Sequence, residues 1–201
     1  MSEQISDEHK LVPEEPAART YLRKVTRHDE EEFVALMRDS IDLHEPWISP
    51  PTSPTLFRYY LQRVNREDHE GYLICLRENE AIVGAININN IVRGSFQSAS
   101  LGYYVAAAHQ GHGYMTDGLK QLVRHACGTL GLHRLEANIQ PDNERSQQLV
   151  ERCGFVCEGL SKNFLYINGA WRDHVRWAYV DERSTLRAHS GGLTPLWNRV
   201  R

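Results

Sequence analysis

The segment from Leu101 to Met115 constrains the fold most, because a strand pattern passes there directly into a helix pattern. Two glycines, Gly111 and Gly113, lie at the junction. Glycine lacks a Cβ atom, so a ligand can approach the main chain closely. The free N–H groups of a first helical turn and the helix dipole favour an anion, most simply a phosphate or pyrophosphate. From the glycines alone, a simple turn without a ligand is the alternative.

Two common phosphate-binding loops do not fit this junction. A Rossmann loop of the form G-x-G-x-x-G that starts at Gly111 would need glycine where the chain has Thr116. A Walker loop needs lysine after its last glycine, followed by serine or threonine, and those letters occur nowhere in the sequence. Both classes of nucleotide site are therefore excluded.

Hydrophobic periodicity along the rest of the chain predicts a mixed sheet with helices. Strands are predicted at residues 21–25, 71–77, 81–92, 98–106, 134–139, 155–167 and 171–180, the last two joined at Asn168-Gly169. Helices are predicted near residues 28–37, 55–64, 119–130 and 146–153. Three prolines between residues 44 and 51 exclude a helix there and predict an exposed loop. The order βααβββαβαββ is that of an α/β protein of the α+β kind.

Length and composition predict one globular domain between two tails. The chain has 201 residues, of which 41% are hydrophobic and 24% charged. Residues 1–18 are acidic and proline-containing and are expected to form a flexible N-terminal tail, and residues 182–201 a C-terminal tail. The domain is therefore expected over residues 19–181.

Charge and hydropathy exclude two classes of partner. The formal net charge of −3 provides no global basic field for nucleic acid. No apolar stretch approaches the roughly 18 to 20 residues that a membrane helix needs, and the first 16 residues have no apolar signal region. We expect a cytoplasmic protein without nucleic-acid or membrane partners. The four cysteines, Cys75, Cys127, Cys153 and Cys157, form no C-x-x-C pair, so reduced core thiols and no metal are expected.

Five motifs resemble the GNAT acetyltransferase superfamily, and within it the RimJ/RimL branch of ribosomal-protein-alanine N-acetyltransferases. The first is Gln110-Gly-His-Gly-Tyr-Met115, whose last position departs from the glycine or alanine of the family pattern. The others are Pro141-Asp-Asn-Glu-Arg-Ser146, Glu151-Arg-Cys-Gly-Phe155, Leu43-His-Glu-Pro-Trp47 and Asn168-Gly-Ala-Trp-Arg-Asp-His-Val175. The resemblance covers roughly residues 19 to 181.

The resemblance implies the GNAT fold, a single mixed and mostly antiparallel splayed sheet flanked by about four helices. It also implies an acyltransferase that uses acetyl-CoA as cosubstrate and transfers acetyl directly to a primary amine. The expected acceptor is the N-terminal α-amine of a protein such as a ribosomal protein. The alternatives are a small-molecule amine, or a domain that binds CoA without turnover. A homodimer is a further expectation from the family.

The residues expected to bind acetyl-CoA follow from the motifs. An extended pantetheine arm needs an open strand edge, and the strand before the junction leads straight to the pyrophosphate loop. Asn143 would otherwise be an ordinary helix cap. The predicted set is Tyr103, Tyr104, Val105, Gln110, Gly111, His112, Gly113, Tyr114, Met115, Asn143 and Ser146.

The expected catalytic residues are Ser146, Asn138 and Glu136. Many family members carry a tyrosine acid seven residues after the asparagine, but that position is Val150 here. Ser146 is therefore the candidate for a hydrogen bond to the leaving sulfur, with a bond to its own helix as the alternative. Asn138 occupies the position of the family base but cannot accept a proton at neutral pH. Glu136 lies on the same strand face as Asn138 and is a candidate base. The alternative is that Glu136 forms a salt bridge with a basic neighbour.

The loop before the second predicted helix is expected to bind the acceptor. Its candidate residues are His44, Glu45 and Trp47, and the first two are also candidate bases. The alternative for His44 is an ordinary surface histidine, and the alternative for Trp47 is a side chain that anchors the loop in the core.

Overall fold

The computed structural model describes residues 18–45 and 47–183. The predicted tails therefore lie almost wholly outside the described residues.

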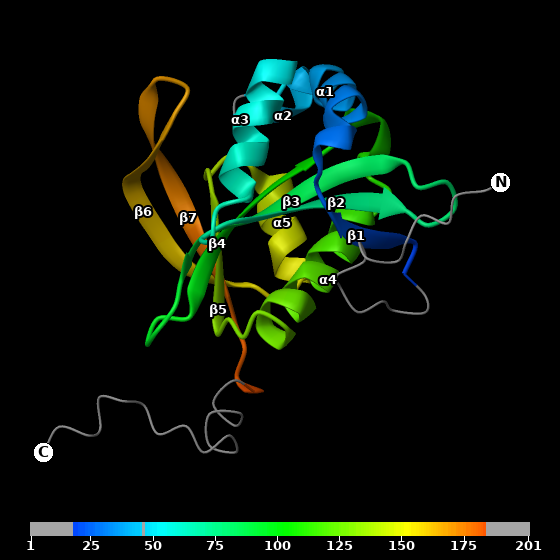
Figure 1. The fold of residues 1–201 in the computed structure, drawn as a ribbon. Helices are drawn as coiled ribbons and strands as arrows, with labels where there is room; N and C mark the ends of the chain where they lie inside the picture. The colour runs from blue at the N-terminus through cyan, green and yellow to red at the C-terminus, as the bar shows by residue number, and fades with distance from the viewer. Residues whose placement is uncertain (1–17, 46, 184–201) are drawn as a thin grey trace, which may run out of the picture.

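A single seven-stranded sheet in the order β1-β2-β3-β4-β5-β7-β6 forms the centre of the molecule (Figure 1). Every neighbouring pair is antiparallel except β4 and β5. The predicted mixed and mostly antiparallel sheet is therefore confirmed. Its strands are β1 Thr20–Lys24, β2 Glu70–Leu76, β3 Ile82–Val92, β4 Ser98–Val105, β5 Arg134–Ile139, β6 Val156–Ile167 and β7 Ala170–Val180.

Helices cover both faces of the sheet. The α-helices are α1 Glu30–Arg38, α2 Ile41–His44, α3 Pro54–Val64, α4 Tyr114–Gly128 and α5 Glu144–Arg152, with short 3-10 turns at Arg27–Asp29 and Ala107–His109. The four-residue helix α2 is absent from the predicted order. His44 therefore ends a helix instead of lying in the predicted loop. None of the helices in the described ranges has the length and apolar character needed to cross a membrane.

Two apolar clusters hold the layers together. One lies between the sheet and α4 and α5 and includes Leu119 and Leu122, and the other lies between the sheet and α1 and α3 and includes Phe33 and Phe57. The four side chains are fully buried, and burying each contributes about 1.5 to 3 kcal/mol. Strand β2 and the first part of β3 lie between these clusters, so they are buried on both faces.

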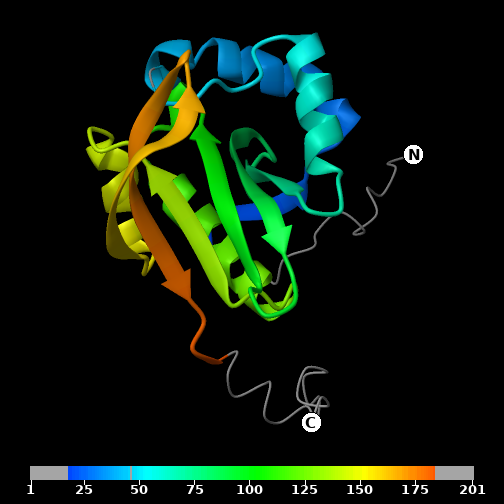
Figure 2. The same cartoon turned by 90° about the vertical axis from the view of Figure 1, so that its left-hand side faces the viewer.

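The parallel pair β4 and β5 opens the sheet at its middle. Their register runs from Ser98 beside Arg134 to Leu101 beside Ala137 and then stops. Beyond that point the two strands diverge (Figure 2). The edge of β4 from residue 102 onward therefore has no β5 partner, which is the predicted splay.

The four cysteines do not all behave as predicted. Cys75, Cys127 and Cys153 are buried free thiols, but Cys157 is exposed. The core interpretation was wrong for Cys157 because strand β6 is the outer edge of the sheet and is largely exposed along its length.

Candidate functional site

The divergence of β4 and β5 opens into a cleft of about 1760 Å³. The start of α4, the start of α5, the loop after α2 and part of β7 all line it. The sequence motifs, which are scattered from residue 43 to residue 175, therefore border one cavity.

The glycine junction adopts the backbone that its sequence predicts. Gly111 has φ +82° and Gly113 has φ +81°, in the left-handed region that other residues avoid. Gly113 is the N-cap of α4 and has no side chain to satisfy the N–H groups of the first turn. Those groups are therefore left for a ligand. Phosphate binding at this junction stays a prediction.

Arg19 braces this loop, a role that the sequence did not indicate. Its Nη2 donates to the main-chain oxygen of His112 at 2.8 Å and lies 3.3 Å from an oxygen of Asp117. The ring of His112 stacks on Tyr114 with centroids 5.6 Å apart. His112 therefore contributes to loop geometry, and Arg19 ties the start of β1 to it.

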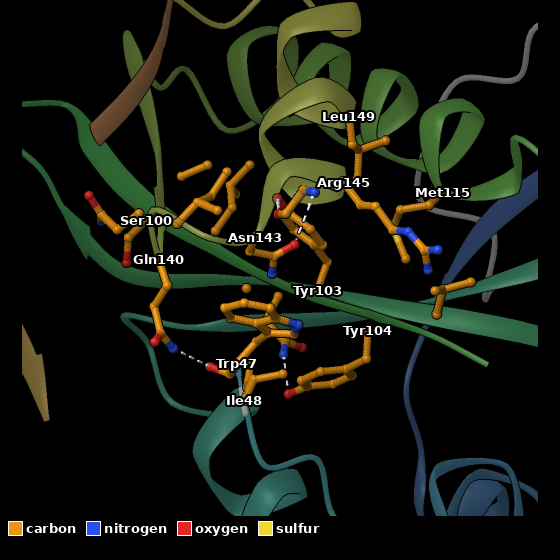
Figure 3. A pocket seen from close by; sticks show the side chains of 18 of the residues that line it. Trp47, Ile48, Ser100, Tyr103, Tyr104, Met115, Gln140, Asn143, Arg145 and Leu149 are labelled. Atoms are coloured by element: carbon orange, nitrogen blue, oxygen red, sulfur yellow. Dashed lines mark hydrogen bonds between the residues drawn. The ribbon is translucent and has the colours of Figure 1, made fainter. Parts of the chain in front are cut away.

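Tyr103 and Ser146 meet in the cleft although 43 residues separate them. The Tyr103 hydroxyl oxygen and Ser146 Oγ are 2.5 Å apart. Asn143 caps α5, with its Oδ1 accepting from the Ser146 N–H at 3.1 Å (Figure 3). Burial raises the pKa of Tyr103, so the phenol stays protonated. A tyrosine from β4 therefore lies beside the helix that lacks one at Val150.

Tyr104 follows Tyr103 on β4, and its side chain points to the face of the strand opposite to that of Tyr103 (Figure 3). Its hydroxyl accepts a hydrogen bond from Asn87 at 2.9 Å, and its ring packs edge-on to Phe33. The side chain is buried in the α1 and α3 layer. Its phenol thus serves the core, although Tyr104 also borders the cleft.

The two strand candidates for a base have different surroundings. Glu136 accepts from Arg134 at 2.9 Å with one oxygen and from Arg176 at 2.7 Å with the other. Glu136 therefore forms salt bridges with both arginines, as the alternative to a catalytic role predicted. Asn138 lies on the same face of β5, and its buried Oδ1 has no hydrogen-bond partner among the described residues.

His44 is buried rather than on the surface, so the surface alternative is wrong. It is 6% exposed, and its ring lies edge-on to Tyr104 with centroids 6.1 Å apart. Burial lowers the pKa of His44, and a hydrogen bond with the main chain of Val105 acts in the opposite direction. Its Nε2 has no hydrogen-bond partner among the described residues. Glu45, in contrast, is exposed.

The Trp47 loop is fastened on two sides. Gln140 donates to the main-chain oxygen of Trp47 at 3.2 Å, and Ser49 donates to Asn168 at 3.1 Å. Trp47 is half-buried and borders the cleft (Figure 3). The prediction of an exposed loop holds only in part, because tertiary contacts from the end of β5 and the β6–β7 turn fasten it.

Sequence reasoning gave no role to His174, which also lines the cleft. It is 1% exposed, and its Nδ1 lies 2.9 Å from the main-chain oxygen of Arg172. Burial lowers the pKa of His174. Because side chains alternate along a strand, the sequence could have predicted that His174 and Arg176 share one face of β7. Only the order of the strands in the sheet shows that this face borders the cleft.

Two curated relatives match the chain over about half of its length. It is 43% identical over 98 residues to the ribosomal protein uS5-alanine N-acetyltransferase of Escherichia coli, covering 49% of this chain and 50% of the relative. It is 30% identical over 96 residues to the ribosomal-protein-serine acetyltransferase of the same organism, covering 48% and 53%. The chain thus spans about half the length of these relatives.

A solved structure and a family profile cover more of the chain. The structure of Mycobacterium smegmatis RimJ in complex with CoA-disulfide superposes with a TM-score of 0.75 and 28% identity, covering 86% of this chain and 89% of that one. The profile described as acetyltransferase (GNAT) domain matches residues 19–156, which is more than half of the chain. The chain therefore belongs to the GNAT acetyltransferase family.

Proposed function

We propose that this protein is an acetyl-CoA-dependent N-acetyltransferase that transfers acetyl directly to the N-terminal α-amine of a protein. The observation that carries the proposal is the hydrogen bond between Tyr103 and Ser146 beside the unpaired edge of β4. The ribosomal-protein acetyltransferases among the relatives support a protein such as a ribosomal protein as acceptor.

The donor end of the cleft suits an extended ligand that ends in phosphates. The edge of β4 beyond Leu101 offers main-chain groups to the amides of a pantetheine arm. The left-handed glycines and the uncapped first turn of α4 suit the pyrophosphate. When bound, acetyl-CoA supplies the thioester whose C–S bond breaks as the amine forms the new C–N bond.

Ser146 and Tyr103 act on the leaving sulfur in this proposal. Either hydroxyl of this pair can donate to the other. In the proposed mechanism the phenol donates to Ser146 Oγ, and the serine hydroxyl donates to the leaving sulfur. Because burial raises the pKa of Tyr103, the pair stabilises the thiolate by hydrogen bonding rather than by giving up a proton. Asn143 holds Ser146 through the cap of α5.

The acceptor end offers little base, which favours an α-amine. The arginines hold both oxygens of Glu136, and Asn138 has no basic atom. The reference pKa of an α-amine is about 7.7 to 8.0 and that of lysine about 10.4, so near neutral pH only the α-amine has a sizeable neutral fraction. His44, which is buried, lines the cleft and has a lowered pKa, is our candidate to receive the proton.

The test compares three acceptors with the full-length protein and acetyl-CoA. These are a peptide with a free N-terminus and no lysine, an N-terminally blocked peptide with one lysine, and spermidine. We expect CoA release and a mass increase on the first residue of the free peptide, with a rate that rises with pH until its amine has titrated. Equal rates with the blocked peptide would overturn the α-amine proposal. Tight acetyl-CoA binding without CoA release from any amine would indicate a non-catalytic domain.

The proposal extends to the protein as a whole. We assign the catalytic unit to residues 19–181 and propose that it works in the cytoplasm without nucleic acid or membrane. The family profile begins at residue 19, which supports the first of these bounds. The homodimer stays a prediction, and sedimentation of the purified protein tests it.

A further inference from the structure

A second cavity of about 500 Å³ lies beside the cleft, between α2 and α3. Residues from α2 and the loop after it form one wall, and residues of α3 form the other. We call this cavity the α2–α3 corridor, and its residues used below are Ile41, Glu45, Ile48, Leu56, Tyr59 and Arg63.

The corridor exposes apolar side chains that the core does not use. The inner face of α3 is Phe57, Tyr60 and Val64, and all three are buried. Leu56 and Tyr59 lie one residue before the first two of these, so they point to a different side of the helix. They are 48% and 64% exposed, and Ile41 opposite them is 42% exposed. The corridor therefore presents three large apolar side chains to solvent, where an apolar side chain of a ligand can contact them.

The corridor is continuous with the acceptor end of the cleft. Glu45, Ile48, Arg63 and Tyr104 line both cavities. A chain whose first residue lies in the cleft can therefore leave past these residues and enter the corridor. Glu45 and Arg63 are exposed and offer one charge of each sign to the polar main chain of such a segment.

We propose that the α2–α3 corridor receives an apolar side chain of the acceptor polypeptide, a few residues after its N-terminal residue. This inference rests on the proposed function, and it names the acceptor as a polypeptide rather than a small amine. An extended chain advances about 3.3 Å per residue, so an acceptor of several residues can occupy both cavities at once. A polyamine is cationic along its length and gains little from walls of isoleucine, leucine and tyrosine.

The experiment uses the full-length protein, acetyl-CoA and a series of acceptor peptides. Each peptide has eight residues, the same first residue and a glycine and serine background, with one leucine placed in turn at positions three to eight. We expect one position, or two neighbouring ones, to lower the acceptor KM at least fivefold while kcat stays within twofold. The leucine-free peptide gives the reference KM.

Matched variants decide whether the corridor causes this preference. Leu56→Glu and Tyr59→Ser should each abolish it without changing kcat for the leucine-free peptide. The controls are Leu160→Glu and Tyr166→Ser on β6, which are 53% and 63% exposed and line neither cavity. Both controls should keep the preference. Thermal unfolding of all four variants verifies that each is folded.

The outcomes separate the two proposals. If the wild type acetylates the peptides but the leucine position has no effect, the corridor inference is overturned and the proposed function stands. The same holds if Leu56→Glu and Leu160→Glu change KM alike. If no peptide is acetylated while spermidine is, both the polypeptide acceptor and the corridor inference are overturned.

Discussion

At the scale of single residues, the Tyr103 and Ser146 pair is the main feature of the site. Serine alone is a weak hydrogen-bond donor to a thiolate. The phenol oxygen lies 2.5 Å from Ser146 Oγ, and either hydroxyl can donate in this pair. When the phenol donates, it strengthens the outward O–H of the serine, because hydrogen bonds in a chain polarise one another. The pair should therefore act as a unit in turnover.

We expect Ser146→Ala to lower kcat by about ten to a thousandfold with a smaller effect on acetyl-CoA affinity, because the interaction is made mainly in the transition state. Tyr103→Phe should lower kcat as well, and the double variant should lose little more than Ser146→Ala. Steady-state kinetics and calorimetric titration with acetyl-CoA measure both quantities. An unchanged kcat in Ser146→Ala, with chemistry shown to limit the rate, would remove Ser146 from the mechanism.

At the scale of elements, the junction of β4 and α4 governs donor binding. The first turn of α4 is open because glycine is its cap, and Arg19 holds the loop from the side of β1. A Cβ atom at Gly113 would lie 3.1 Å from Nη2 of Arg19. Any side chain there also meets the unfavourable positive φ.

We expect Gly113→Ala to raise the dissociation constant for acetyl-CoA at least tenfold, which is about 1.4 kcal/mol. The matched control is Gly131→Ala, since Gly131 also has a positive φ of +68° but a Cβ atom there would meet no described atom within 4 Å. Both variants should lose some stability from backbone strain, but only Gly113→Ala should lose affinity. Equal affinities measured by calorimetry would show that the junction does not bind the donor.

At the scale of the whole molecule, a polar cluster joins the β1 and β2 end of the sheet to α4. Glu70 accepts from Lys24 at 2.8 Å and from the Tyr72 hydroxyl, which also lies 2.8 Å from Nε2 of His125. Burial by itself raises the pKa of Glu70, but His125, whose Nε2 lies 3.9 Å away, and hydrogen bonds from Lys24 and Tyr72 outweigh it and lower the pKa to about 2. The folded state thus favours the ionised carboxylate.

This cluster predicts a pH dependence of stability. A carboxyl group with a lowered pKa stabilises the fold above its unfolded value of 4.5, and this contribution is lost as the pH falls toward about 2. We expect Glu70→Gln to lower the free energy of unfolding at pH 7 by on the order of 2 kcal/mol. Urea unfolding at pH 7, 5 and 3 should show the difference from wild type shrinking as the pH falls. A constant difference would contradict the assignment.

Local sequence determined the strands, the longer helices and the shape of several turns, but not the short helix α2. Strand β5 has the predicted bounds, the Asn168-Gly169 turn joins β6 to β7, and both junction glycines have the positive φ that their position requires. These features depend on neighbours within a few residues, so alternation and turn chemistry suffice to predict them. The GNAT motifs added the family.

Only the tertiary structure decided which side chains meet. The contact of Tyr103 with Ser146, the pairing of Glu136 with Arg176 and the packing of His44 on Tyr104 each join segments far apart in the chain. Each depends on where β4 parts from β5 and on how the helices pack against the two faces of the sheet. Packing of this kind is a property of all the buried side chains together, so no local pattern in the sequence records it.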